Sequence, residues 1–416
     1  MKKTLKLDFL ALEKYFSWQE LSNSKNRVHP KFSRRIVKPI RLYLYGLIAN
    51  FYSHPVSSNI QCDVLMLHRS EKSRKRGLRD HVTKQLRKQG LNVIEAQTEK
   101  NKSILKNKLF SSPPVKTPIK FLFYASYANY IVEKYSPKVI MTETNGSDLS
   151  PFLKAFLPKG SSLVHVAHCA ITDNYRHYSL IDYDYYFLYG KSSFDKLHKR
   201  NNLFGSCKAV LTGPYIPHHA APLPPCEANK NIMLFGVNPN MERRPHIKKT
   251  YTFIRNWAQQ HTDYQLFIKT HPRSETDFWD KAQACSPNIH FVKQGTSMQE
   301  ALGKISITLG IYTNAVLDAA LRNRPSLLVS DDTVGDEFDI EKFFLPRCRN
   351  ESELQANIEK LLANYPYYVE KTGEFSQYHL AHQDDSVNFI AQCVDDIVHD
   401  NETFPVEPLH GTMFSN

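Results

Sequence analysis

The stretch ISITLGIYTNAVLDAALRNRPSLLV, residues 305–329, contains two short apolar runs on either side of an amphipathic one. The runs ISITLG (305–310) and PSLLVS (325–330) have the length and the residue types of buried strands. Between them, NAVLDAALRN has apolar residues at helical spacing and follows Thr313, where a helix can begin. A strand, a helix and a strand in such close succession predict a βαβ unit with parallel strands.

The same alternation extends toward the N-terminus as far as residue 231. Its other strand-like runs are NIMLFG (231–236), YQLFIKTH (264–271) and NIHFVKQG (288–295). Each is followed by a stretch with helical periodicity. We therefore predict a doubly wound, Rossmann-like domain in this half of the chain.

A second alternation of the same kind precedes it. Its strand-like runs are CDVLMLH (62–68), LNVIEA (91–96), KVIMTET (138–144), SLVHVAH (162–168), YDYYFLYG (183–190) and KAVLTG (208–213). The predicted fold class is therefore α/β, with two doubly wound Rossmann-like domains that face a central cleft.

The boundary between the two halves is marked by PYIPHHAAPLPPCEANKN (214–231), which contains five prolines and no apolar periodicity. We predict five segments along the chain. They are a basic, amphipathic N-terminal segment (1–58), a first Rossmann-like domain (59–215), a proline-rich linker (216–230), a second Rossmann-like domain with terminal helices (231–400) and a tail (401–416).

The chain has 54 Lys and Arg against 41 Asp and Glu, a formal charge of +13. This excess predicts an anionic partner. The candidates are nucleic acid, an acidic membrane surface and a phosphorylated small molecule. The segment RRIVKPIRLYLYGLIANFYSH (34–54) mixes basic and apolar residues. Such a helix suits either an anionic membrane interface or the protein's own core.

Cysteine usage and the N-terminus bear on the compartment. The seven cysteines are scattered, and none forms a CxxC pair, which argues against a disulfide framework and a zinc site. Charged residues interrupt the apolar part of MKKTLKLDFLALEKYF, so it is a poor secretory signal. We expect a cytoplasmic protein that is peripheral on the inner face of the cell membrane.

The loops after the strands of the second domain carry residues suited to a phosphate-bearing ligand. FGVNPN (235–240) offers backbone N–H groups, and FIKTHPR (267–273) offers two cations and a histidine. The helix after Thr313 favours an anion, and a carboxylate one turn later suits ribose hydroxyls. The candidate donor-binding residues are Gly236, Asn238, Lys269, His271, Arg273, Thr313, Asn314 and Asp318.

If such a ligand is the donor of a group that is transferred to a hydroxyl, the second domain binds the donor, and the first domain binds the acceptor and supplies a base from its strand ends. VHVAHC (164–169) offers His168, and TETNGSD (142–148) offers Glu143 and Asp148. We favour His168 for phosphoryl transfer, and Glu143 or Asp148 for glycosyl transfer.

Residues 160–330 resemble the two-domain GT-B glycosyltransferases and the similar CDP-glycerol glycerophosphotransferases in the order and spacing of their motifs. The motifs are VAHCAITDN, DYDYYFLYGKSSF, LTGPYIP, NIMLFG, FIKTHPR and ISITLGIYTNAVLDAALRNRPSLLV. The resemblance implies that His271 and Thr313 bind the phosphate of a nucleotide donor, often a cytidine nucleotide, and that His168 stands at the place of the base. It also implies that neither a metal nor a further cofactor is needed. The glycerophosphotransferases usually have His-Gly where this chain has His168-Cys169.

The sequence thus predicts an inverting, metal-independent glycosyltransferase that moves a sugar from a nucleotide donor to a bacterial capsule or lipopolysaccharide. Its partners would be the donor, a glycan or lipid-linked acceptor and an anionic membrane surface, and not nucleic acid. The alternatives are a CDP-glycerol glycerophosphotransferase, a sugar-nucleotide epimerase of the same fold, and a nucleic-acid-binding protein that uses the basic run at 72–90.

Overall fold

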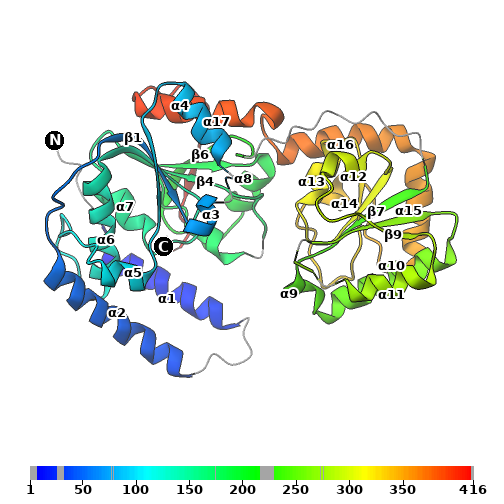
Figure 1. Cartoon of the computed structure of the whole chain (residues 1–416), viewed down its shortest axis with the longest axis horizontal. Coiled ribbons are helices and arrows are strands. Elements are labelled where there is room, and N and C mark those ends of the chain that lie inside the picture. Colours follow the sequence, from blue (N-terminus) through cyan, green and yellow to red (C-terminus); the bar gives the residue numbers. More distant parts are fainter. Residues whose placement is uncertain are drawn as a thin grey trace. The chain divides into compact units, whose positions relative to one another are not determined.

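The computed structural model describes residues 7–25, 32–75, 77, 79–173, 175–215, 229–271, 273–274 and 276–413. The chain divides into two compact units, unit 1 (1–217 with 381–416) and unit 2 (218–380) (Figure 1). Most of the predicted linker, residues 216–228, lies outside the described residues, as do residues 1–6 and 26–31 of the predicted N-terminal segment.

Unit 1 is built on a seven-stranded sheet. The strands are β1 (Cys62–His68), β2 (Val93–Gln97), β3 (Pro137–Thr142), β4 (Ser162–Val166), β5 (Tyr185–Leu188), β6 (Ser206–Leu211) and β12 (Glu407–His410). Their order is β12-β6-β5-β4-β3-β1-β2, and only β12 is antiparallel to its neighbour. The chain reverses its direction of winding between β1 and β3. In an open sheet of this kind, such a switch point is where ligands bind.

Helices cover both faces of this sheet. They are α1 (Phe9–Lys25), α2 (Phe32–Tyr52), α3 (Glu71–Lys75), α4 (Asp80–Lys88), α5 (Asn101–Lys106), α6 (Ile119–Tyr135), α7 (Ser150–Phe156), α8 (Lys191–His198) and α17 (Ser386–Val398). Helices α4 and α17 cover one face, and α6 and α7 cover the other (Figure 1). Helix α2 packs on the outside of α6.

The end of the chain differs from the sequence expectation, which placed residues up to 400 in the second domain. Helix α17 belongs to unit 1. Its buried Ile390 and Val394 share one core cluster with Val64 of β1 and Val139 of β3. After it, β12 pairs with β6, so the predicted tail adds an edge strand to the first sheet. Helix α17 packs on unit 1 because this contact buries its apolar face.

Unit 2 contains five parallel strands, β7 (Asn231–Phe235), β8 (Gln265–Lys269), β9 (Ile289–Phe291), β10 (Ile307–Gly310) and β11 (Ser326–Leu328). Their order is β11-β10-β7-β8-β9. This is the strand order of a Rossmann domain, with the switch point between β7 and β10. The predicted βαβ unit is confirmed as β10, a helix and β11.

The helices of unit 2 are α9 (Pro239–Glu242), α10 (Pro245–Gln260), α11 (Asp277–Cys285), α12 (Met298–Leu302), α13 (Ala315–Ala320), α14 (Ile340–Phe343), α15 (Glu351–Ala363) and α16 (Tyr365–His379). Helices α10 and α11 lie on one side of the sheet, and α12, α13 and α16 on the other (Figure 1). The predicted α/β class with two Rossmann-like sheets is therefore confirmed. Within the described residues, no helix has the length and apolar content that a bilayer span requires.

Candidate functional site

A cavity of about 320 Å³ lies at the switch point of unit 1. Four strand ends contribute to it. Its lining residues are Arg69, Ser70, Lys72 and Ser73 after β1, Glu143 after β3, His168 after β4 and Tyr215 after β6. We call it the His168 pocket. Two lysine or arginine side chains and a histidine in one wall suit an anionic or hydroxyl-bearing ligand.

Glu143 is part of this wall, but its carboxylate is already engaged. Ser73 Oγ donates a hydrogen bond to Glu143 Oε1 at 2.6 Å. The other carboxylate oxygen forms an ion pair with Arg79, and the two side chains are only 10% and 5% exposed. A carboxylate that neutralises a buried arginine is poorly suited to accept a proton, since protonation would leave that cation unpaired.

Arg79 lies behind the pocket wall. Its guanidinium carbon is 5.8 Å from the centre of the Tyr215 ring, a cation–π arrangement. Burial lowers the pKa of Arg79 to about 10, so the side chain stays charged at neutral pH. The Arg79–Glu143 pair therefore ties the segment before α4 to the end of β3.

His168 is the candidate base whose ring is exposed in this pocket. Partial desolvation lowers its pKa, and the positive charges of Arg69 and Arg79 lower it further. The ring is therefore neutral at physiological pH, which both a base and a neutral hydrogen-bond donor require.

Asn145 sets the tautomer of His168. The amide Nδ2 of Asn145 lies 3.3 Å from His168 Nδ1, and its Oδ1 lies 2.6 Å from Nε2 of the buried His165. With the amide in this orientation, neutral His168 carries its hydrogen on Nε2 and is a donor. With the amide turned over, Nδ1 carries the hydrogen and Nε2 accepts a proton. At either orientation, Nε2 is the nitrogen left for a ligand.

Asp148, the third candidate base, lines a different cavity. That cavity is bordered by α1, α2 and α6, and Asp148 shares it with Tyr124 and Tyr43. The chain turns at Gly146, which has a φ of 62°. The structure therefore brings His168 and Glu143 together and separates Asp148 from both.

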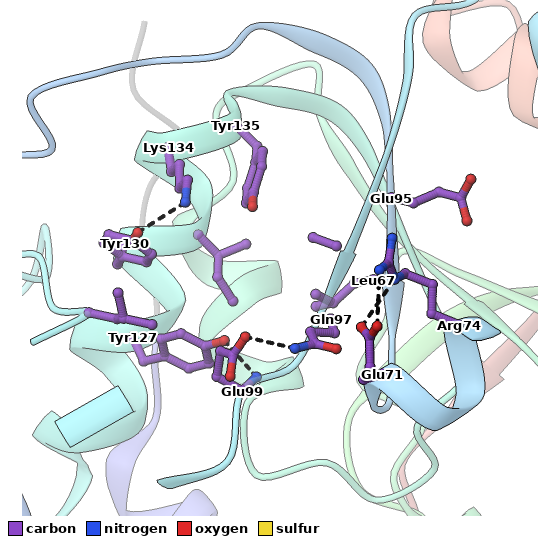
Figure 2. Close-up of a pocket in the computed structure, with 13 residues that line it drawn as sticks. Leu67, Glu71, Arg74, Glu95, Gln97, Glu99, Tyr127, Tyr130, Lys134 and Tyr135 are labelled. Carbon is purple, nitrogen blue, oxygen red and sulfur yellow. Dashed lines mark hydrogen bonds and ion pairs between the residues drawn. The ribbon is translucent and has the colours of Figure 1, made fainter. Parts of the chain in front are cut away.

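A third cavity, of about 290 Å³, lies on the other side of α3 (Figure 2). Glu71 and Arg74 of α3 line it, whereas Lys72 and Ser73 of the same helix line the His168 pocket. The rings of Tyr127 and Tyr130 are stacked with their centres 6.4 Å apart. Aromatic faces with nearby carboxylates and hydroxyls are suited to bind sugar rings. Short hydrogen bonds order its polar groups.

Figure 2 shows these hydrogen bonds at the end of β2, between that end and α6, and within α6. Gln97 Nε2 donates to Glu99 Oε1 at 2.9 Å, and the Glu99 backbone N–H donates to the Tyr127 hydroxyl at 2.9 Å. Lys134 donates to the Tyr130 hydroxyl at 3.2 Å. These hydrogen bonds hold the polar groups of the cavity in place.

In unit 2, Gly236 lies directly after β7 at the switch point. Its N–H donates to the carbonyl of Lys269 at 2.9 Å. A Cβ atom at this position would lie 3.2 Å from Thr270 Cα and 3.3 Å from His271 N. Glycine therefore allows the loops after β7 and β8 to approach closely. Ser274 Oγ reinforces this approach by donating to the carbonyl of Val237 at 3.0 Å.

His271 is held by its own loop. Its Nδ1 accepts a hydrogen bond from the Arg273 N–H at 3.2 Å, so neutral His271 carries its hydrogen on Nε2. Partial burial lowers the pKa of His271, and Arg273 lowers it further. A neutral imidazole with a free Nε2–H is a directed donor to a phosphate oxygen.

Two other predicted donor-site residues have partners within the protein. Lys269 Nζ donates to the carbonyl of Thr296 at 3.1 Å, and burial lowers its pKa. The side chain of Asn238 accepts from the N–H groups of Asn240 and Met241 at 3.1 and 3.3 Å. The N–H groups expected to face a phosphate at this turn are therefore already bonded to Asn238.

The loop after β10 provides the remaining candidates. Thr313 Oγ1 accepts from the Ala315 N–H at 3.2 Å at the start of α13, and Asn314 is exposed. Asp318 forms an ion pair with the buried Arg322, in which Asp318 Oδ1 lies 3.5 Å from Arg322 Nη1. The strand order brings Gly236, His271 and Thr313 to one edge of the sheet, because their strands β7, β8 and β10 are neighbours.

Several residues that line the His168 pocket or contact its lining residues were not singled out from the sequence. These are Arg69, Lys72, Ser73, Arg79, Asn145 and Tyr215. The first four lie in or beside the basic run at 72–90, whose sequence is equally typical of a solvent-exposed helix. Their position at a switch point becomes visible only when the strand order is known.

No family model and no curated protein matches the sequence. Solved structures match most of its length. MnaA of S. aureus in a structure with UDP has a TM-score of 0.52 at 11% identity and covers 82% of this chain and 99% of its own. The glycotransferase of kitacinnamycin has a TM-score of 0.51 at 11% identity, with coverages of 81% and 99%. A putative UDP-N-acetylglucosamine 2-epimerase from Listeria monocytogenes has a TM-score of 0.51 at 12% identity, with coverages of 83% and 98%.

These likenesses establish the fold. The chain has the two Rossmann-like domains of the GT-B class, which includes proteins named as glycosyltransferases and as sugar-nucleotide epimerases.

Proposed function

We propose that the protein is a glycosyltransferase that moves a sugar from a nucleotide-activated donor to a growing bacterial surface polysaccharide, such as capsule or lipopolysaccharide. The main support is the placement of suitable groups at both switch points. In unit 1, the exposed ring of His168 shares a pocket with Arg69 and Lys72. In unit 2, Gly236 and His271 lie where a Rossmann domain binds phosphate.

The donor is assigned to unit 2. The neutral Nε2–H of His271 and the exposed cation of Arg273 would hold the donor's phosphates, and the close loops at Gly236 would shape their seat. Thr313 and Asn314 would contact the same nucleotide from the next strand. We propose a cytidine nucleotide as the donor's leaving group, on the family resemblance of the His-Pro motif.

The acceptor is assigned to unit 1, with His168 as the base. His168 Nε2 takes the proton of the acceptor hydroxyl, whose oxygen bonds to the sugar's anomeric carbon. The bond from that carbon to the donor phosphate breaks, and the leaving nucleotide keeps the electron pair. Attack from the opposite side inverts the anomeric centre, and cationic side chains neutralise the leaving group without a metal.

Arg69 and Lys72 indicate an acceptor that is itself anionic, such as a lipid-linked phosphate. The tyrosine-lined cavity beside α3 would hold a preceding sugar of that acceptor. With such an acceptor, we propose that the enzyme works in the cytoplasm on the inner face of the cell membrane.

The same two cations favour one alternative, the transfer of glycerol phosphate or another polyol phosphate from a CDP donor. Here the acceptor oxygen attacks phosphorus, and a phosphodiester forms instead of a glycosidic bond. Phosphorus NMR of the product separates the two reactions, because only the alternative adds a phosphodiester signal.

The first experiment is thermal unfolding of the full chain with CMP, CDP, UDP, GDP and their sugars. A ligand at about 100 times its Kd adds roughly 2.7 kcal/mol to stability. We expect one cytidine compound to raise the melting temperature, and His271→Ala to abolish the shift. If none of these nucleotides raises the melting temperature, the proposal loses its basis.

Two further readouts separate the rival functions. An epimerase would convert a sugar nucleotide without an acceptor, which proton NMR of the incubated donor detects. A nucleic-acid-binding protein would bind arbitrary duplexes with a steep salt dependence instead of one nucleotide.

A further inference from the structure

Helix α2 has two apolar faces, and one of them is packed on α6. At Gly46, a Cβ atom would lie 1.9 Å from the carbonyl oxygen of Ile119, so the two helices are in close contact there. Ala49 is fully buried, and the ring centre of Tyr45 lies 5.2 Å from that of Phe123. This face accounts for the attachment of α2 to unit 1.

The second apolar face is exposed. It consists of Ile40, Tyr43, Leu44, Leu47, Ile48 and Phe51, which are 55%, 49%, 54%, 51%, 37% and 75% exposed. We call these six residues the α2 stripe. Their spacing of three and four residues places them on one side of the helix. Six of the eleven large hydrophobic side chains that are exposed among the described residues lie here, so they form a patch and are not scattered.

The charge of α2 has one sign. Its sequence, FSRRIVKPIRLYLYGLIANFY, contains Arg34, Arg35, Lys38 and Arg41 and no acidic residue. At its C-terminal end, Lys108 Nζ lies 4.0 Å from the centre of the Tyr52 ring. A helix with an apolar stripe and only basic charges is suited to an anionic lipid surface.

We infer that the α2 stripe inserts into the interface of an anionic membrane. A second copy of the chain is the competing occupant, but a second α2 helix offers these basic residues no carboxylate, because α2 contains no acidic residue. The acidic residues Glu13, Glu20 and Asp148 line the cavity beside Tyr43. We therefore expect the Tyr43 edge to stay at the surface, and Leu47 and Phe51 to insert deepest.

This inference deepens the proposed function, because it names the element that brings the enzyme to a lipid-linked acceptor. Its test requires neither donor nor acceptor, so the two proposals fail separately. If nucleotides stabilise the protein but it does not bind vesicles, only the membrane-docking inference fails. If the protein binds vesicles but no nucleotide stabilises it, only the proposed transferase function fails.

The test is cosedimentation of the full-length protein with vesicles of phosphatidylcholine alone and of phosphatidylcholine mixed with phosphatidylglycerol. The variant is Leu47→Ser with Phe51→Ser. The matched control is Tyr367→Ser, because Tyr367 is 54% exposed on α16 of unit 2. Circular dichroism and the melting temperature verify that each variant folds, and light scattering reports the oligomeric state.

We expect the wild type and the control to bind the anionic vesicles, and added salt to weaken that binding. Loss of each inserted side chain should weaken binding about tenfold, so the double variant should bind roughly a hundredfold more weakly. The inference is overturned if the wild type stays in the supernatant, or if the folded double variant binds like the wild type. A dimer that the double variant dissociates, without vesicle binding, would show that a second copy covers the stripe.

Discussion

Glu143→Gln is expected to destabilise unit 1, because Glu143 balances a buried cation. Arg79 is 4% exposed, and the carboxylate of Glu143 is its ion-pair partner. Removal of one member of a buried pair costs about 3–5 kcal/mol, since the other charge is left uncompensated. At about 2–4 °C per kcal/mol for a unit of this size, the melting temperature should fall by roughly 6–20 °C.

The assay is calorimetry, in which the transition of unit 1 is compared between variants. Glu71→Gln is the matched control, because Glu71 pairs with Arg74 on α3 and both side chains are more than 40% exposed. Water and salt screen an exposed pair, which therefore contributes little to stability, so this variant should melt close to the wild type.

A double variant separates the pair from its members. Arg79→Met with Glu143→Leu removes both charges and should be less destabilised than Glu143→Gln alone. The reasoning is refuted if Glu143→Gln melts like the wild type while transfer activity is lost. That outcome would make Glu143 a catalytic residue and not a structural one.

Four shorter predictions concern the two switch points. His168→Gln should keep the melting temperature and the nucleotide shift but lower the transfer rate by about 10²- to 10⁴-fold, measured at saturating donor. Asn145→Asp should move the acid limb of the kcat/KM profile to higher pH, because a carboxylate beside His168 Nδ1 stabilises the imidazolium. Burial lowers the pKa of His165 well below 6.5, so the unfolded chain binds the extra proton and stability is lost as pH falls below 6.5. The loss should shrink in His165→Phe, measured by thermal unfolding against pH. Gly236→Ala should weaken nucleotide binding about tenfold in titrations, because the new Cβ displaces the His271 loop.

Local patterns predicted the strands and helices well, because the apolar period of each segment reports its own burial. The βαβ unit at 305–329 is an example. The strand order could not be predicted, because it depends on contacts between distant segments. Glu143 seemed as available as His168 until its pairing with Arg79, 64 residues earlier in the chain, was known. Likewise, Asp148 lies only five residues beyond Glu143 but faces another cavity, because the chain turns at Gly146.

In the proposed mechanism, neighbouring residues of the His168 pocket serve stability and chemistry separately. The Arg79–Glu143 ion pair and the hydrogen bond from Ser73 fix the loops after β1 and β3. Neither Arg79 nor Glu143 needs to change its charge for this role. His168 lies at the end of the adjacent strand, where exposure lets it exchange protons with a ligand. If Glu143 were the base, each proton transfer would leave the buried charge of Arg79 unpaired, at a cost of about 3–5 kcal/mol. The assignment of His168 as the base avoids this cost. It also makes Asn145, which contacts both His168 and His165, the residue whose amide orientation decides whether His168 Nε2 donates or accepts a hydrogen.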